Sequence, residues 1–154
     1  MTAIPPPELV LLPFKPADQA QVKDLILAGM VEHWGVLDPS KNPDLNDIGA
    51  SYAGAVFLVA WQQNRVIGTG ALVPRSNDTA EIVRMSVAAG LRRQGLGRRI
   101  LLELCRQARS AGYRKIVLET TQTWDGAIAF YKRLGFRVSH HVDDEIYFVL
   151  DLSD

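Results

Sequence analysis

The sequence predicts one α/β (α+β) domain, spanning residues 1–154, in which about four helices lie on the faces of a central sheet. The sheet is expected to be mixed and mostly antiparallel, with six to seven strands. Two observations lead to this prediction. The chain has 154 residues, 47% of them hydrophobic, which is enough for one sizeable core. Strand-like and helical patterns then follow one another in the order β-α-α-β-β-β-α-β-α-β-β, without internal repeats.

The first half of the chain predicts a strand, two helices and a hairpin. Residues 9–14 are apolar and strand-like, and Pro16 and Asp18 then open a helix. Residues 38–47 hold two prolines, two asparagines and three aspartates, which is typical of a loop. A short helix is expected over residues 48–52. Two strands, 56–61 and 66–73, are expected to form a hairpin around Gln63-Asn64.

The second half predicts four strands and two helices. A strand over residues 81–87 precedes a helix over 97–110, which Gly112 ends. A strand over 115–120 precedes a helix over 125–133, which Gly135 ends. The last two strands are expected at 136–139 and 146–150. Asp143-Asp144 lies in the turn between them, and His140 and His141 are expected to be exposed in the same turn.

The composition excludes several classes of protein. Acidic and basic residues balance at 17 each, so no global charge favours nucleic acid or a membrane surface. No signal peptide is evident, and no apolar run approaches the ~20 residues that span a bilayer, so a cytoplasmic protein is expected. Cys105, the only cysteine, is expected to be buried, and its isolation fits a reducing compartment. We expect no metal site.

Residues 92–97, Arg-Arg-Gln-Gly-Leu-Gly, predict an anion-binding turn. Two glycines allow a tight turn, and the helix that follows presents free amides and the positive end of its dipole. Arg98 and Arg99 add positive charge, so a pyrophosphate is the expected ligand. A P-loop is excluded because its lysine and hydroxyl are missing. A dinucleotide fold fits less well, because Ile100 stands where a small residue is needed; the third alternative is a helix start with solvated arginines.

A second motif, Phe130-Tyr131-Lys132-Arg133-Leu134-Gly135-Phe136, follows downstream. Residues 92–97 match the signature Gln/Arg-x-x-Gly-x-Gly/Ala. With these two motifs in this order, the chain resembles the GNAT superfamily of N-acetyltransferases, specifically over residues 80–137. The predicted order of elements is also the one that this family shows.

The resemblance implies acetyl-CoA as co-substrate, held by a group of cofactor-binding residues on the strand and turn before the long helix. The strand would bind the pantetheine arm through its backbone, beside a bulge, and its amides near Val87 could polarise the thioester. The family often has an asparagine seven residues before its tyrosine; here Trp124 stands there. The implied cofactor-binding residues are Met85, Ser86, Val87, Arg92, Arg93, Gln94, Gly95, Leu96, Gly97 and Arg98.

The resemblance also implies two catalytic residues, Tyr131 and Glu81. Tyr131 matches the family's tyrosine that donates a proton to the leaving thiolate. Glu81, fourteen positions before Gly95, is the first candidate for the base that deprotonates the amine. Glu119 is the second candidate and His33 a distant third. In the alternative interpretation Glu81 only begins a strand in solvent, paired with Arg84 or Arg75.

The acceptor is expected to be a primary amine on a small molecule or a peptide. Aromatic and acidic residues in the first helices and their loop could recognise a cationic amine, or could equally be caps and turn formers. The alternative function is a non-catalytic acyl-CoA-binding sensor or interaction module. A homodimer is left open, since the apolar C-terminal strands could pair between subunits. The acceptor-side residues are His33, Trp34, Asp38, Asp44, Asp47 and Tyr52.

Overall fold

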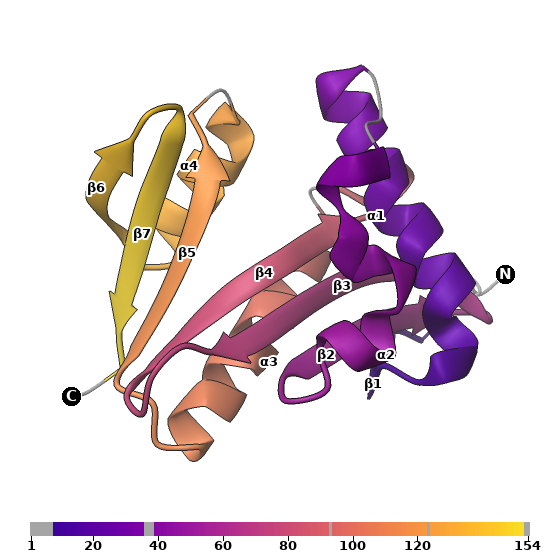
Figure 1. Cartoon of the computed structure of the whole chain (residues 1–154), viewed down its shortest axis with the longest axis horizontal. Helices are drawn as coiled ribbons and strands as arrows, with labels where there is room; N and C mark the ends of the chain where they lie inside the picture. Colours follow the sequence, from indigo (N-terminus) through magenta and orange to yellow (C-terminus); the bar gives the residue numbers. More distant parts are fainter. Residues whose placement is uncertain (1–7, 36–38, 93, 123, 153–154) are drawn as a thin grey trace, which may run out of the picture. The chain divides into compact units, whose positions relative to one another are not determined.

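The structure, a computed structural model, describes residues 8–35, 39–92, 94–122 and 124–152. Its strands follow the order β1-β2-β3-β4-β5-β7-β6 in a seven-stranded sheet (Figure 1). This confirms the predicted mixed α/β architecture. The chain divides into two compact units, Met1–Ala71 with Arg84–Leu102, and Leu72–Val83 with Glu103–Asp154. The expectation of one domain over residues 1–154 stays a proposal.

The first unit begins with an antiparallel pair of strands and a long helix. Strand β1 pairs with β2 antiparallel, in a register that places Val10 opposite Trp61. The turn between β2 and β3 is tight because Gln63 and Asn64 both adopt positive φ, 51° and 64°, as a two-residue hairpin of this twist requires. The elements that lie wholly in the first unit are β1 (Val10–Pro13), η1 (Pro16–Asp18), α1 (Gln19–Trp34), η2 (Pro39–Lys41), η3 (Pro43–Asn46), α2 (Ile48–Ser51), β2 (Val56–Gln62) and η4 (Ala89–Leu91). The first unit also contains parts of β3 (Arg65–Pro74), β4 (Thr79–Val87) and α3 (Leu96–Ser110).

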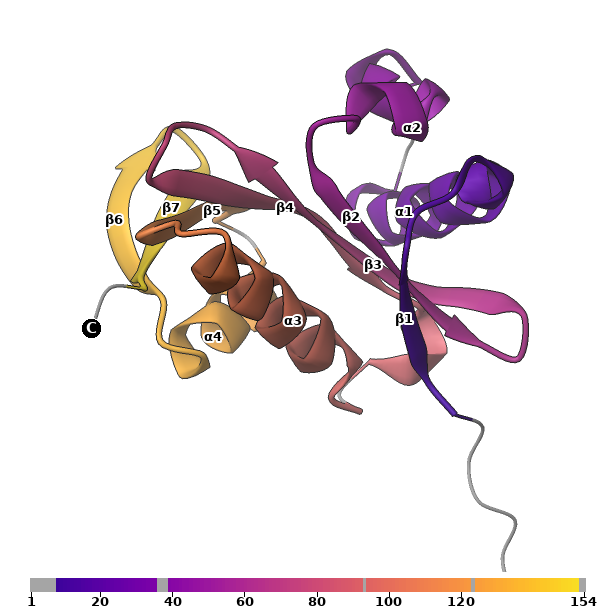
Figure 2. The same cartoon turned by 90° about the horizontal axis from the view of Figure 1, so that it is seen from below.

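In the first unit, helices lie on both faces of β3. Helix α1 lies on one face, and the first turns of α3 lie on the other (Figure 2). The approach of α3 is close: a Cβ on Gly68 would lie 2.8 Å from Ile100 Cδ1 and 3.2 Å from Leu96 Cδ2. Only glycine fits there. Val22 and Ile26 are buried on α1.

The second unit packs helices against one face of the beginning of β4 and of β5, β7 and β6. Strand β4 pairs parallel with β5 (Lys115–Thr121) over Thr79–Glu81 only. Strand β5 pairs antiparallel with β7 (Glu145–Asp151), and β7 with β6 (Arg137–Val142). Alternate residues of these strands are buried, including Ile116, Leu118 and Phe148. Helix α4 (Asp125–Arg133) lies beside these strands (Figure 1).

The helices α3 and α4 end in the same way. Gly135 adopts φ 99°; its amide donates to Lys132 O, and the Phe136 amide donates to Tyr131 O. This pair of hydrogen bonds is a Schellman motif, which explains why the glycine stands between Leu134 and Phe136. Gly112 closes α3 with the equivalent pair.

Several boundaries differ from the predicted ones. The most consequential error concerns His140 and His141, which lie in β6 and not in a turn, although both are exposed as expected. A register shift between Val138 and His140 allows β6 to continue to Val142. The predicted loop at 38–47 also contains two short 3-10 helices.

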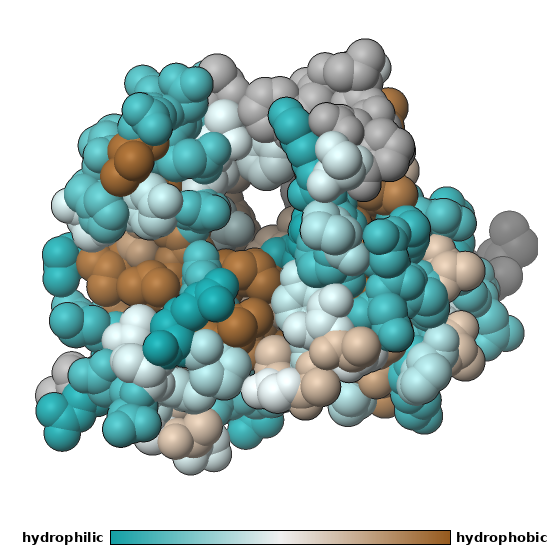
Figure 3. All heavy atoms as spheres, viewed as in Figure 1, coloured by the Kyte–Doolittle hydropathy of each residue, from teal (hydrophilic) through white to brown (hydrophobic). Residues whose placement is uncertain are grey.

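The strands of the second unit expose apolar side chains on the face opposite the helices. In the same view as Figure 1, Figure 3 shows these hydrophobic areas of the surface with hydrophilic areas around them. Val117 is half-exposed there, and Val142 is 48% exposed. Pairing of these strands between subunits stays a prediction.

Candidate active site

The turn predicted to bind an anion lies in the first unit, between β4 and α3. The end of β4 is fixed by the amide of Ala88, which donates to Ile67 O at 2.9 Å. Gly95 adopts φ 84°, and a Cβ there would have no atom within 4 Å. The turn is therefore tight, needs a glycine conformation and borders open space.

The last two residues of the 92–97 segment, Leu96 and Gly97, are also the first two residues of helix α3. Its first intrahelical bond runs from the Arg99 amide to Gly95 O, at 3.0 Å. The three amides before it, from Leu96 to Arg98, therefore have no acceptor within the helix. Leu96 is buried and anchors the turn, while Gln94 and Arg98 are exposed. A helix of 15 residues whose first amides have no acceptor within the helix suits an anion.

The arginines around the turn differ in their contacts. Arg92 forms an ion pair with Glu32 of α1, with both side chains close to half-exposed. Arg99 donates to Leu9 O at a long 3.4 Å. Arg93 lies outside the described residues. A bound phosphate would meet Arg92 already paired with a carboxylate.

Strand β4 contains a residue in an unusual conformation just before the predicted pantetheine-binding segment. Arg84 adopts φ 56°, the left-handed region that disfavours a residue with a Cβ. Its carbonyl accepts a hydrogen bond from Thr69 Oγ1 at 2.8 Å. Met85, Ser86 and Val87 are each half-buried. A left-handed residue turns the strand, and the sequence offered no local signal for it.

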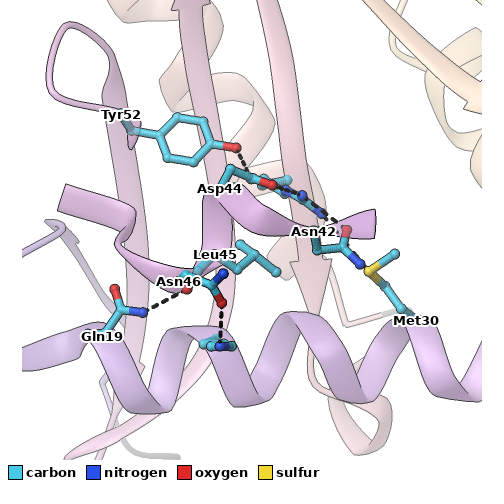
Figure 4. A network of polar contacts seen from close by, with 9 residues as sticks. Gln19, Met30, Asn42, Asp44, Leu45, Asn46 and Tyr52 are labelled. Atoms are coloured by element: carbon cyan, nitrogen blue, oxygen red, sulfur yellow. Dashed lines mark hydrogen bonds and ion pairs between the residues drawn. The ribbon is translucent and has the colours of Figure 1, made fainter. Parts of the chain in front are cut away.

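The side chain of Arg84 joins a polar cluster of the first unit, together with Asp44, Tyr52 and Asn42 (Figure 4). Its Nη2 and Nε bond the two carboxylate oxygens of Asp44 at 2.6 Å and 3.0 Å. Nη2 also bonds Asn42 Oδ1 at 3.2 Å, and Tyr52 donates to Asp44 Oδ2 at 2.6 Å. The one sequence clue was a second charged residue, besides Glu81, within this strand.

Burial and hydrogen bonding shift the pKa values in this cluster. Burial raises the pKa of Asp44, but the hydrogen bonds and charge of Arg84 and the hydroxyl of Tyr52 outweigh it, so that the pKa is lowered. Burial and the Asp44 carboxylate raise the pKa of Tyr52. The cluster therefore holds one negative and one positive charge at neutral pH.

The first candidate base, Glu81, lies in the second unit and is held by an arginine. Arg75 Nε donates to Glu81 Oε1 at 2.6 Å, and Nη2 lies 2.5 Å from the same oxygen. Glu81 is mostly covered, with 16% of its side chain exposed, and stands opposite Val117 of β5. Of the two pairings that the sequence left open, the one with Arg75 is therefore formed, whereas Arg84 is paired with Asp44.

Tyr131 is also in the second unit, on α4, and its side chain packs among aromatic rings. Its ring lies 5.8 Å from Phe136 and 5.9 Å from Phe148, centroid to centroid. Only 8% of the residue is exposed, and burial raises its pKa to about 12. The phenol therefore stays protonated throughout the neutral range.

Glu119, the second candidate base, stands directly opposite Tyr147 in the β5–β7 pair. Tyr147 is hydrogen-bonded to Glu119, and this bond, with the charge of Glu119, raises the pKa of Tyr147. The ring of His140 stacks on Tyr147 at 4.5 Å. Sequence reasoning missed Tyr147 because its partner lies 28 positions away on another strand.

The remaining predicted residues are scattered. Asp47 caps α2 through the Ala50 amide, so it takes the helix-cap role that was one of its two expected roles. Trp124 precedes α4. Asp38 lies outside the described residues, and the side chains of His33 and Trp34 are not described. A hollow of about 450 Å³ beside β1 and the β2–β3 turn contains none of the predicted site residues.

Two further findings concern the described part of the chain. Within it, no three histidine, cysteine, aspartate or glutamate residues are grouped to hold a metal ion. Each helix there is too short or too polar to cross a bilayer. The expectation of a metal-free site stays a prediction.

Known proteins resemble the chain in sequence and in fold. It is 29% identical over 123 residues to the uncharacterized N-acetyltransferase YjgM of Escherichia coli (strain K12), covering 72% of this chain and 74% of that one. It spans about half the length of several vertebrate relatives that it matches. A GNAT-family acetyltransferase from Staphylococcus aureus Mu50 superimposes with a TM-score of 0.86 at 21% identity, over 95% and 100% of the two chains. PaiA N-acetyltransferase from Thermoplasma acidophilum, in complex with coenzyme A, gives 0.81 at 17% identity, over 94% and 99%.

The family itself is shown by the sequence. The Acetyltransferase (GNAT) family matches residues 21–136, a span that contains the turn at 92–97, Glu81 and Tyr131. This span is most of the chain, and it includes both motifs that carried the resemblance. The chain belongs to the GNAT family of acetyltransferases.

Proposed function

We propose that the protein transfers the acetyl group of acetyl-CoA to a primary amine by direct attack of the amine on the thioester. The observation that carries this proposal is left-handed Gly95, which leads into the first amides of α3, from Leu96 to Arg98, that have no acceptor within the helix. Family membership supports acetyl transfer in general. A solved neighbour that carries coenzyme A supports the choice of cofactor.

In the proposed complex, backbone groups would hold most of the coenzyme. The first amides of α3 would bind the pyrophosphate, with Arg98 adding positive charge. The backbone of Met85–Val87 would bind the pantetheine arm, and an amide near Val87 would stabilise the oxygen of the tetrahedral intermediate. The half-exposed side chains of this segment are compatible with a ligand beside it.

The amine must lose a proton before it attacks, because an alkylamine has a pKa of ~10.4. Glu81 is the proposed acceptor of that proton, directly or through water. Its Oε1 is bonded by Arg75, so the base would use its other oxygen or exchange partners. Glu119 is the alternative base. It is bonded by the hydroxyl of Tyr147, and no described contact joins it to an arginine.

The thiolate of coenzyme A must gain a proton as it leaves. Tyr131 is the proposed donor. Its raised pKa, about 12, makes the phenol a weaker acid but keeps it protonated until the thiolate forms. Sharing this proton at hydrogen-bond distance contributes ~10²–10⁴ in rate.

The acceptor is proposed to be a small molecule, with a peptide amine as the alternative. Asp44 and Tyr52 supply an anionic and an aromatic group in the first unit, though both are engaged with each other. Because Asp44 is also paired with Arg84, recognition of a cationic amine by this group of residues would depend on the aromatic ring of Tyr52.

The second candidate function is a sensor that binds acyl-CoA without turnover. The packing of Tyr131 among Phe136 and Phe148 is the observation that favours it, since an aromatic core residue needs no catalytic role. Turnover distinguishes the two functions.

Calorimetric titration with acetyl-CoA, dephospho-CoA and NAD is the test of the proposal. Micromolar binding of acetyl-CoA with no NAD signal is expected, followed by release of free thiol when amines are added. A protein that binds acetyl-CoA but acetylates no amine would be the sensor. No binding of acetyl-CoA would exclude both functions.

A variant of the turn completes the test. Gly97→Asp adds bulk and negative charge at the start of α3 and should weaken acetyl-CoA binding by tenfold or more, about the effect of 1.4 kcal/mol. Unchanged affinity would show that the phosphates bind elsewhere.

A further inference from the structure

We propose that Asp44 is a positioning residue, which holds Arg84 in its left-handed conformation and thereby sets the direction of the backbone amides at Met85–Val87. This inference rests on the proposed function, since those amides would face the thioester. It assigns Asp44 to the cofactor-binding strand and not to the recognition of the acceptor amine.

The first argument is that the conformation of Arg84 needs support. For a residue with a Cβ, the left-handed region near φ 56° is populated roughly tenfold less than the right-handed region. The reason is that the Cβ approaches the residue's own carbonyl oxygen. Such residues persist where the surrounding contacts determine the backbone. Arg84 immediately precedes Met85, so a change of its φ would rotate every amide that follows.

The second argument is that the contacts of Arg84 fix both its side chain and its backbone. Asp44 bonds the guanidinium with both carboxylate oxygens, which is the most directional pairing available to an arginine. On the backbone side, fully buried Thr69 donates to Arg84 O. The segment is then fixed at its far end by the bond from Ala88 to Ile67.

The third argument is that Asp44 is itself held in place. Tyr52 donates to its Oδ2 at 2.6 Å. The segment around it is tied to α1 by Gln19, whose Nε2 donates to Leu45 O at 2.7 Å and whose Oε1 accepts from the Ile48 amide at 2.9 Å (Figure 4). An anchored carboxylate can restrain an arginine, whereas a mobile one would follow it.

The same contacts argue against a direct role for Arg84 in binding the acceptor. Nε and Nη2 bond Asp44 and Asn42, and Nη1 lies 4.0 Å from Met30 Sδ. Only 19% of the Arg84 side chain is exposed. A substrate carboxylate would have to displace Asp44.

A double-mutant cycle with Asp44→Asn and Arg84→Gly tests the proposal. Glycine adopts φ 56° without strain, so it needs no support from Asp44. Asp44→Asn in the wild-type background should therefore lower kcat by about tenfold. In the Arg84→Gly background the same substitution should have no further effect.

Hydrogen exchange measured without ligand provides a readout that does not depend on activity. Asp44→Asn should speed exchange of the amides at Met85–Val87, while peptides from α1 serve as the internal reference. The control is Asp47→Asn, which retains a helix cap in the same segment and does not touch Arg84; it should change neither exchange nor kcat.

The outcomes separate the two proposals. If Asp44→Asn still lowers kcat in the Arg84→Gly background, or raises only the KM of the amine, Asp44 acts on the acceptor and the inference is wrong. If the exchange result holds while acetyl-CoA does not bind the wild type, the positioning role stands and the proposed function fails. Unchanged exchange in Asp44→Asn would overturn the positioning role even in an active enzyme.

Discussion

Gly68 on β3 allows the start of α3 to approach the sheet, and replacing it with alanine should disturb both stability and coenzyme binding. The new Cβ would lie 2.8 Å from Ile100 Cδ1 and 3.3 Å from the carbonyl oxygen of Ser86. The isoleucine tip can move, but the backbone oxygen cannot. Overpacking of this kind lowers the free energy of unfolding by ~1–3 kcal/mol. Alanine also reduces the conformational entropy of the unfolded chain, which raises the free energy of unfolding by ~0.4–1 kcal/mol. The midpoints of these two ranges give a net loss of about 1.3 kcal/mol, or roughly 3–5 °C in Tm for a chain of this size.

Chemical and thermal unfolding measure the stability, and calorimetry measures acetyl-CoA affinity. Leu96 and Ile100 lie in the first turns of α3, so their displacement should also weaken binding by up to about tenfold. Gly90→Ala is the matched control, because a Cβ there meets no atom within 4 Å and its φ is not positive. If Gly68→Ala proves as stable as Gly90→Ala, the close packing of α3 on β3 is incorrect.

Four further predictions follow from the site. Gly95→Ala places a Cβ at φ 84° and should cost ~1–2 kcal/mol of stability while weakening acetyl-CoA binding, as measured by unfolding and calorimetry. Tyr131→Phe should lower kcat by ~10²-fold or more with coenzyme affinity retained, and an unchanged kcat would remove Tyr131 from the mechanism. Glu81→Gln should lower kcat/KM by ~10²-fold and more than Glu119→Gln does; the reverse order would assign the base to Glu119. The pKa of Asp44 is lower in the folded protein than its value of ~3.9 in the unfolded chain. Its carboxylate therefore stabilises the folded protein fully at pH values above ~3.9, and this stabilisation is lost as the pH falls through the lower pKa of the folded state. The difference in unfolding free energy between wild type and Asp44→Asn should therefore be constant near neutral pH and shrink below about pH 4; a difference that persists in acid would contradict this.

Local signals predicted much of the fold. Helix α4 has the predicted bounds, Asp125–Arg133, because its apolar period ends at a glycine that closes a Schellman motif. The β2–β3 hairpin was predicted for the same kind of reason, since Gln63-Asn64 stands between two apolar runs. Each of these features depends on residues within a few positions of one another.

The features that the sequence did not predict depend on distant partners. The left-handed Arg84 is bonded to Asp44, 40 positions earlier, and no local pattern marks that pair. The extension of β6 through His140 depends on its register with β7 and not on its own composition. The burial of Tyr131 also depends on a distant partner, because Phe148 approaches it from another strand.

The ion pair between Arg92 and Glu32 bears on product release. In the proposed complex, a phosphate that takes Arg92 must replace a carboxylate that already sits there. An exposed pair of this kind is worth only ~0–1 kcal/mol, so the exchange would weaken coenzyme affinity by no more than about fivefold. In return, Glu32 can recapture the arginine when the spent coenzyme leaves, so the free site need not carry an unpaired charge between turnovers.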